Sequence, residues 1–455
     1  NRLMQATFGL LGVLILGTYA IESVYGAKSW AGMWRISGVG DLPAGIGPLS
    51  LLPGLIILLW VASRLLKFPP DRQKWTWGRR DIALPLLALS ALIAFRLYPD
   101  VGSTNSFQVV VLMGLVWFVF LFVVNEQPNL VVPLALTVTI QGAVAIGQFL
   151  LQRDLGLFAL GEPALDRMVP GVSILMAMGT RWLRAYGLTG HPNLLGTTVA
   201  VALLILFPAF RRARGLPQVV LGLAMLVGFL GLLVSFSRAA WLGFAMGMLV
   251  WLIGGRIRGE QGLFGSMSSL VKPRFVVGIL LLLLAGFLFR YHELVTSRFL
   301  INSGYTEMLS LTDRLRDSRL ALEIIAAHPW RGSGAGKYFD EARSLDEGAQ
   351  IVHNVPLLMT AELGIPGAVL WLWLVVACFR GAKSESSRVF KDAGSGKSGH
   401  HDSLFYIEVI APWVAFLVIG LFDYNPWPFV LMRGAVLFGS LAAQIAAPYH
   451  LIESK

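Results

Sequence analysis

The chain has 455 residues, of which 56% are hydrophobic and 14% charged, and its mean hydropathy is +0.68. This composition is typical of membrane proteins and argues against a soluble enzyme of several domains. The formal net charge of +11 raises the alternative of nucleic-acid binding, but the basic residues fall mostly between apolar segments, where positive-inside topology explains them. The single cysteine, Cys378, lies in an apolar segment and excludes both a disulfide framework and a thiolate metal site.

Long uncharged segments recur along the chain, and most are long enough to cross about 30 Å of hydrocarbon. They predict an all-α polytopic membrane protein with about twelve transmembrane helices. The first run, near residues 6–21, lacks a small-residue cleavage signature, so we expect a retained first helix and no signal peptide. The expected helices lie near residues 5–22, 48–65, 82–98, 107–124, 130–151, 191–210, 218–235, 239–255, 274–291, 355–379, 404–423 and 428–447.

The charges between these helices predict the topology. With the N-terminus in the cytoplasm, four basic loops fall inside, at residues 67–80, 211–214, 256–274 and 380–397. We therefore expect both termini in the cytoplasm, nine helices within residues 1–290, a large extracytoplasmic loop over 291–352 and three helices within 353–455. The Gly-, Ser- and Lys-rich segment 381–403 predicts a flexible cytoplasmic loop.

Three pieces of chain are expected on the extracytoplasmic face. The apolar but short run 168–180 predicts an interfacial or re-entrant segment. The second piece is the tight turn 235–238, with sequence SFSR. The third is the large loop, in which we expect a helix over about 313–327, stopped by His328-Pro329 and followed by a glycine-rich turn at 332–336.

Three expected helices enter the membrane from this face, near His191, Arg238 and His353, and their N-termini favour an anion. Guanidinium groups pair with two phosphate oxygens at once and stay charged at any relevant pH. The sequence has neither an HExxH motif nor an acidic cluster suited to a metal on this face, so we expect arginine to neutralise a pyrophosphate, without a metal or other cofactor. The arginines beside these helix starts are Arg181, Arg184, Arg238, Arg314, Arg316 and Arg319.

His353 is the strongest candidate for a general base. Asn354 is a good N-cap and Pro356 suits a first helical turn, so His353 stands at the mouth of a helix. The helix N-terminus and nearby arginines disfavour the imidazolium and keep the ring able to accept a proton. The alternative is that His353 is an ordinary interfacial histidine without a catalytic role. His191 is either a helix-entry residue or a substrate contact, and Glu362 is expected to pack inside the bundle.

Four segments resemble the O-antigen ligase and polymerase superfamily of bacterial polytopic membrane proteins. They cover about residues 180–370, and one departure is Ser318, where many members have a tryptophan four residues after the loop arginine. The matching segments are 184–187 (RAYG) with 190–193 (GHPN), 235–241 (SFSRAAW), 314–336, and 353–367 (HNVPLLMTAELGIPG).

This resemblance implies a GT-C-like fold and glycosyl transfer at the periplasmic face of the bacterial inner membrane. The donor would be O-antigen linked to undecaprenyl pyrophosphate, and in ligases the acceptor is a sugar of lipid A–core, which completes lipopolysaccharide. It implies that His353 takes the proton of the acceptor hydroxyl, which attacks the anomeric carbon with inversion. Arg184, Arg238 and Arg314 would hold the pyrophosphate as it leaves. The other residues expected to bind substrate are Arg181, His191, Asn193, Arg316, Arg319 and Asn354.

Among the branches of the superfamily, twelve spans with one large loop before His353 favour a ligase. A polymerase or a protein O-oligosaccharyltransferase that uses the same lipid-linked donor would show the same motifs. A transporter of lipid-linked glycan would also need an anion-binding bundle, but its charges should lie near the bilayer midplane, whereas here they gather at one surface. The expected partners are the lipid-linked donor, the lipid A–core acceptor and membrane lipid, without nucleic acid.

Overall fold

A computed structural model describes residues 76–97, 104–126, 130–177, 179–257, 273–299, 305–392 and 398–427, together with Phe438, Leu441 and Ala442. The helices expected near 5–22 and 48–65, and most of the helix near 428–447, lie outside these residues. Every other expected helix is present. The long helices are α3 (Arg80–Leu97), α4 (Thr104–Glu126), α5 (Val131–Leu151), α6 (Pro192–Arg212), α7 (Leu216–Val234), α8 (Arg238–Ile257), α9 (Pro273–Arg290), α13 (Val355–Asp392) and α14 (Ser398–Phe422).

The helices form because long apolar runs satisfy their own backbone groups internally, as a lipid environment requires. Five of the described helices are long and apolar enough to cross a membrane, or six if a bent helix pair counts as one span. The chain is therefore a multi-pass membrane protein. A total of twelve spans and a GT-C-like arrangement stay predictions.

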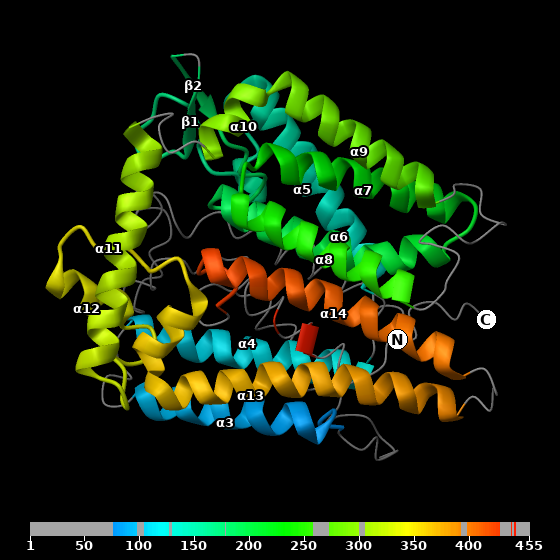
Figure 1. Cartoon of the computed structure of the whole chain (residues 1–455). Helices are drawn as coiled ribbons and strands as arrows, with labels where there is room; N and C mark the ends of the chain where they lie inside the picture. Colours follow the sequence, from blue (N-terminus) through cyan, green and yellow to red (C-terminus); the bar gives the residue numbers. More distant parts are fainter. Residues whose placement is uncertain are drawn as a thin grey trace.

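The long helices lie in two groups joined by α14 (Figure 1). Helices α5 to α9 lie together on one side, α3, α4 and α13 lie on the other, and α14 packs against both α8 and α13. Helix α6 is central, since all its residues from Pro192 to Phe210 are buried. Small residues let neighbouring helices approach closely: a Cβ on Gly231 of α7 would lie 2.7 Å from the Cα of Gly142 in α5.

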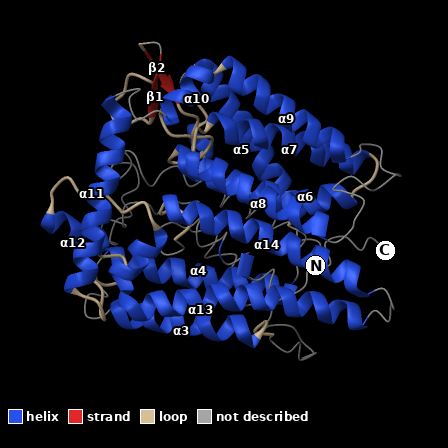
Figure 2. Ribbon diagram, viewed as in Figure 1, coloured by secondary structure: helices blue, strands red, loops and turns tan. Residues whose placement is uncertain are grey.

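The end of the short apolar run at 168–180 forms one strand and the turn of a β-hairpin, so the described chain is mostly but not entirely helical. An interfacial position of this segment stays a prediction. Strands β1 (Ile174–Ala177) and β2 (Thr180–Leu183) pair antiparallel, with Ile174 opposite Leu183. They are the red elements of Figure 2. Residues of β1 alternate between half-buried and buried, as a strand with one covered face requires, and Gly179 takes the left-handed φ of +69° that the turn needs.

Three helices occupy most of the described part of the large loop: α10 (His292–Phe299), α11 (Tyr305–Ala327) and α12 (Tyr338–Leu345). The chain bends by 86° between α9 and α10, so α10 leaves the bundle axis. Helix α11 starts earlier than residue 313 because neither glycine nor proline interrupts the chain after Gly304, and it ends before His328-Pro329 as expected. It runs across the ends of both helix groups (Figure 1).

Helix α13 is broken at Gly364, whose backbone angles of φ 71° and ψ −175° are not helical. Loop segment 329–336 fills the break. Ser333 N donates to Ala361 O at 2.8 Å, and Gly334 N donates to Glu362 O at 3.0 Å. From the other side, Ile365 N donates to the Pro329 carbonyl at 2.8 Å. Backbone groups that the break releases are thereby satisfied, and the loop is fixed to the helix piece that follows His353.

At its other end α13 continues to Asp392, and α14 begins at Ser398. Most of the segment 381–403, expected to be a flexible loop, is therefore helical, and its cytoplasmic position stays a prediction. The segment contains good helix formers between its few glycines, and composition alone underestimated how far the helix extends.

Candidate functional site

The starts of α6 and α13 meet the end of α14. Asn193 Nδ2, in the first turn of α6, donates to Asp423 Oδ2 at 2.6 Å. Asn354 caps α13, since its Oδ1 accepts from Leu357 N at 2.9 Å, and its Nδ2 donates to the Leu421 carbonyl at 2.9 Å. The two asparagines thus connect their helices to the same end of α14.

His353 stands at this junction, directly before the cap of α13. Its ring packs edge-on against Tyr424, with ring centroids 5.2 Å apart. Nδ1 is buried and has no hydrogen-bond partner within the described residues. Burial lowers the pKa of His353 below its usual value; the Asp423 carboxylate opposes this shift and the Arg314 guanidinium adds to it. The imidazole is therefore neutral near pH 7, with one ring nitrogen able to accept a proton.

His191 caps α6, because its Nδ1 accepts from Asn193 N at 3.2 Å. This bond makes Nδ1 the acceptor and leaves the proton on Nε2. Burial lowers the pKa of His191 to about 3, so the ring stays neutral at any physiological pH. Of the two roles left open for His191, the geometry favours helix entry. The neighbouring basic groups that lower its pKa further are Arg184, His353, Arg298 and Arg314.

Arg298, at the end of α10, belongs to this basic group and was not expected from the sequence. It is 8% exposed, and its carbonyl accepts a hydrogen bond from Arg238 Nη1 at 2.6 Å. The 86° bend before α10 brings it back to the start of α8. The sequence did contain a signal for this position, because Leu294, Ser297 and Arg298 are spaced to lie on one face of a helix. In the structure all three are buried.

Arg184 makes its described contacts inside the protein. Nε donates to Ser235 O at 3.0 Å, Nη1 to Ser173 Oγ at 2.9 Å, and Nη2 to Asn193 Oδ1 at 2.7 Å. It therefore holds the β-hairpin, the α7–α8 turn and the start of α6 together. This network explains why Arg184, the residue directly after β2, lies beside the helix starts, although its expected pyrophosphate contact stays a prediction.

The arginines of α11 separate into two surroundings. Arg314 is half-buried, and its charge acts on both His353 and His191. Arg316 instead pairs with Asp313 and Asp317 at 3.2 Å each and approaches Asp346 at 3.8 Å.

Two further expected arginines lie elsewhere. Arg319 has an 82% exposed side chain that pairs with Glu323 at 2.8 Å. Arg181 lies in β2, opposite Met176. Among the described contacts, neither these two residues nor Arg316 joins His353, so their expected roles in substrate binding stay predictions without support from this geometry.

Asp423 is the acidic group at this basic junction and was also missed. It is 1% exposed, accepts from Asn193 through Oδ2 and from Asn425 N through Oδ1 at 3.1 Å, and acts electrostatically on His353. The polar run at 423–425 at the extracytoplasmic end of an expected span was the available signal. A buried carboxylate beside His353 would stabilise the imidazolium that forms when the ring takes a proton.

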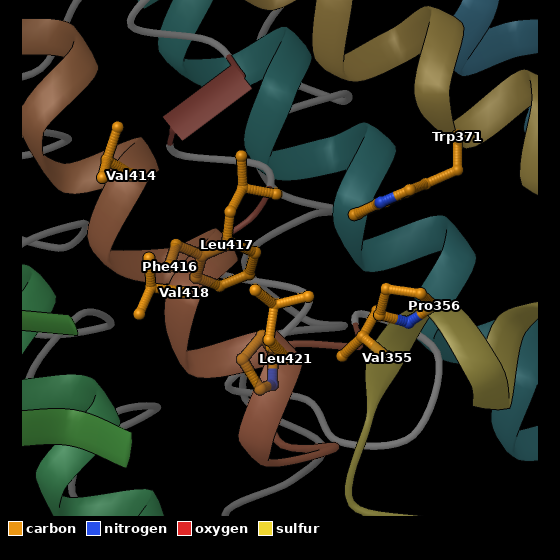
Figure 3. Close-up of a pocket in the computed structure, with 10 residues that line it drawn as sticks. Val355, Pro356, Trp371, Val414, Phe416, Leu417, Val418 and Leu421 are labelled. Carbon is orange, nitrogen blue, oxygen red and sulfur yellow. The ribbon is translucent and has the colours of Figure 1, made fainter. Parts of the chain in front are cut away.

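An apolar cavity of about 200 Å³ lies between α13 and α14, directly after Asn354 (Figure 3). Val355, Pro356 and, further along the same helix, Trp371 line it from α13, and Leu417 and Leu421 line it from α14. A pocket of this kind suits hydrocarbon and not sugar.

Within the described ranges, no three His, Cys, Asp or Glu side chains gather in a group that could hold a metal ion. Catalysis without a metal stays a prediction.

The family model described as O-antigen ligase matches residues 223–372. The matched stretch contains Arg238, Arg298, Arg314 and His353, while Arg184 and Asp423 lie outside it. No curated protein sequence matches the chain.

Proposed function

We propose, from the membership of the O-antigen ligase superfamily that the family match supports, that this membrane protein transfers O-antigen from undecaprenyl pyrophosphate to a sugar of lipid A–core. The reaction takes place at the periplasmic face of the bacterial inner membrane. The observation that carries the proposal is a neutral histidine with an unpartnered buried nitrogen, set among arginines at one end of a membrane bundle.

His353 acts as the general base. The acceptor hydroxyl gives its proton to the imidazole while its oxygen forms a bond to the anomeric carbon of the donor glycan. The bond from that carbon to the pyrophosphate oxygen breaks on the opposite side, which inverts the configuration. Asp423 stabilises the imidazolium that results. The electron pair of the broken bond leaves with undecaprenyl pyrophosphate.

Arg238 and Arg314 stabilise the charge that develops on the leaving pyrophosphate, and Arg298 adds a third cation at the same place. Fixed guanidinium groups in a partly dehydrated site stabilise such charge without reorganising during the reaction. Arg184 bonds the turn that precedes Arg238, and Asn193, His191 and Asn354 fix the starts of α6 and α13 beside His353.

The apolar cavity between α13 and α14 supports a lipid-linked donor. It opens beside the cap that follows His353, so an isoprenoid tail lying there would leave its pyrophosphate near the arginines. Transport of the same lipid would place charged groups along a midplane path, whereas Arg238 is the first residue of α8 and Arg298 and Arg314 lie in the large loop.

A reconstitution tests the acceptor. Purified protein in liposomes is given undecaprenyl-pyrophosphate-linked glycan with lipid A–core, or with further donor alone. We expect glycan on lipid A–core and no elongated donor. Elongated donor without that product would make the protein a polymerase, which the family match accommodates equally well. Transfer to neither would contradict the proposal and favour a protein acceptor or transport.

A further inference from the structure

A second basic cluster lies apart from His353, where α3 ends against the loop that fills the break in α13. Arg96, in the last turn of α3, donates through Nη2 to the Trp330 carbonyl at 2.6 Å. Arg331 follows Trp330, is exposed, and lies close enough for its charge to act on Arg96. Lys337 flanks the same turn: a Cβ on Gly334 would lie 3.5 Å from its Cδ and 3.5 Å from the Arg96 carbonyl.

The cluster has cationic groups that are not neutralised within the described residues. Neither Arg96 nor Arg331 forms an ion pair there, and Arg96 Nε is buried without a hydrogen-bond partner. The hydrogen bond to the Trp330 carbonyl fixes Arg96 next to the residue that precedes Arg331. Two cations without counter-ions so placed favour an oxygen ligand with two negative charges, such as a phosphate.

Apolar surface surrounds these cations. Phe95 is 70% exposed beneath the Arg96 guanidinium, which stands 5.5 Å from its ring centroid, and Trp330 is 67% exposed. Both helices that meet here present further uncovered apolar side chains along their length, a pattern typical of surface that faces lipid. Those side chains are Leu84 and Leu87 of α3, and Val369, Leu372 and Trp373 of α13.

We propose that Arg96, Arg331 and Trp330 bind the phosphate-bearing headgroup of the acceptor lipid, with its acyl chains on the apolar faces of α3 and α13. The inference rests on the proposed function and adds to it a site for the acceptor. One piece of helix, from Val355 to the break at Gly364, separates the cluster from His353. That piece is about 15 Å long at 1.5 Å per residue, so it leaves room for sugars between the bound phosphate and the reacting hydroxyl.

Lipid retention on the purified full-length protein tests this site without any transfer reaction. Native mass spectrometry would compare diphosphorylated lipid A, its dephosphorylated form and phosphatidylglycerol on the wild type and on the Arg96→Gln/Arg331→Gln variant. We expect the variant to lose about tenfold in affinity for diphosphorylated lipid A, the effect of losing one or two charge-assisted bonds. Dephosphorylated lipid A should bind both proteins equally.

A matched control is Arg343→Gln, since Arg343 is an exposed arginine of α12 that stacks on Phe339 in the same loop. It should retain lipid A as the wild type does. If the double variant does not fold, Arg331→Gln alone serves, because this side chain makes no described hydrogen bond. Undiminished retention by a folded variant would overturn the proposal, and so would phosphatidylglycerol that displaces lipid A at equal concentration. Arginine-dependent retention by a protein that transfers no glycan would leave this site standing while the proposed function fails.

Discussion

Arg314 and Arg316 stand two residues apart on α11 and have opposite surroundings. At 3.6 residues per turn they point about 200° apart around the helix axis. Arg316 faces Asp313, Asp317 and Asp346, so its charge is balanced within the loop. Arg314 faces two neutral histidines and shares its surroundings with other arginines. Position around the helix, more than residue type, separates the arginine directed at the two histidines from the one that braces the loop.

The largest expected effect is at the histidine of the basic junction. His353→Ala should lower kcat by about 10³-fold, because the reaction loses its general base. Donor binding and thermal stability should stay close to wild type. The control is His328→Ala, which removes a histidine whose side chain is 46% exposed and stands beside Glu341 in the loop. Near-normal turnover by His353→Ala in liposomes would remove the assignment of the base.

Replacing Arg314 or Arg316 with glutamine tests directly whether the two arginines have different roles. Arg314→Gln should lower kcat by about 10²-fold through lost stabilisation of the leaving group, with little change in Tm. Arg316→Gln should instead lower the free energy of unfolding by about 1–3 kcal/mol, since Asp317 is left without its cation. Asp317 is only 1% exposed, so solvent would compensate little. Thermal unfolding and initial rates of both variants check this, and the reverse pattern would exchange the two roles.

Arg238→Lys tests whether geometry matters at the junction in addition to charge. Lysine keeps the cation but loses the planar fork and the donor that reaches the Arg298 carbonyl. We expect kcat to fall by about tenfold or more at saturating donor. Equal activity of the two proteins would mean that net charge alone is sufficient there.

Lowering the pH should destabilise the folded protein through His191 and His353. Both have a lower pKa in the folded protein than the usual 6.5, so the unfolded chain binds more protons between that value and their folded pKa. The free energy of unfolding therefore falls as the pH falls through this window, by up to about 2 kcal/mol for one histidine at pH 5. Tm measured from pH 7 to 5 should decrease, and His191→Gln should reduce the slope. A slope unchanged by the substitution would show that other groups cause the loss.

The smallest expected effect is that of metal removal. Initial transfer rates in excess EDTA should match those in buffer, because arginines supply the charge that a metal would otherwise supply. A loss that magnesium or manganese restores would contradict the metal-free mechanism.

The sequence predicted the helices that start at the junction because apolar runs, caps and proline positions are local signals. It placed Arg238, Arg314 and His353 near helix starts or in the large loop for the same reason. Arg298 and Asp423 were missed because their positions depend on the 86° bend after α9 and on the contact between α14 and α6. Arg316 was expected to bind substrate, although Asp313 and Asp317 were a local signal for the ion pairs that the structure shows; only its third partner, Asp346, is distant in sequence. Non-local packing accounts for the two missed residues, and the role of Arg316 in substrate binding stays a prediction.

Loop segment 329–336, which is hydrogen-bonded into the break of α13, bears on how loops could be exchanged between related proteins. Its three hydrogen bonds join main-chain atoms, so they do not depend on which side chains the loop carries. The glycines are the exception, because a Cβ on Gly332 would collide with the Glu362 carbonyl, and Gly332, Gly334 and Gly336 all have left-handed φ angles. A graft that keeps these three glycines and the spacing of residues 329–336 would preserve the register while the outer surface of the loop is redesigned. Loops of different composition can therefore bind in the break of α13 through main-chain hydrogen bonds, without disturbing the helix piece that begins beside His353.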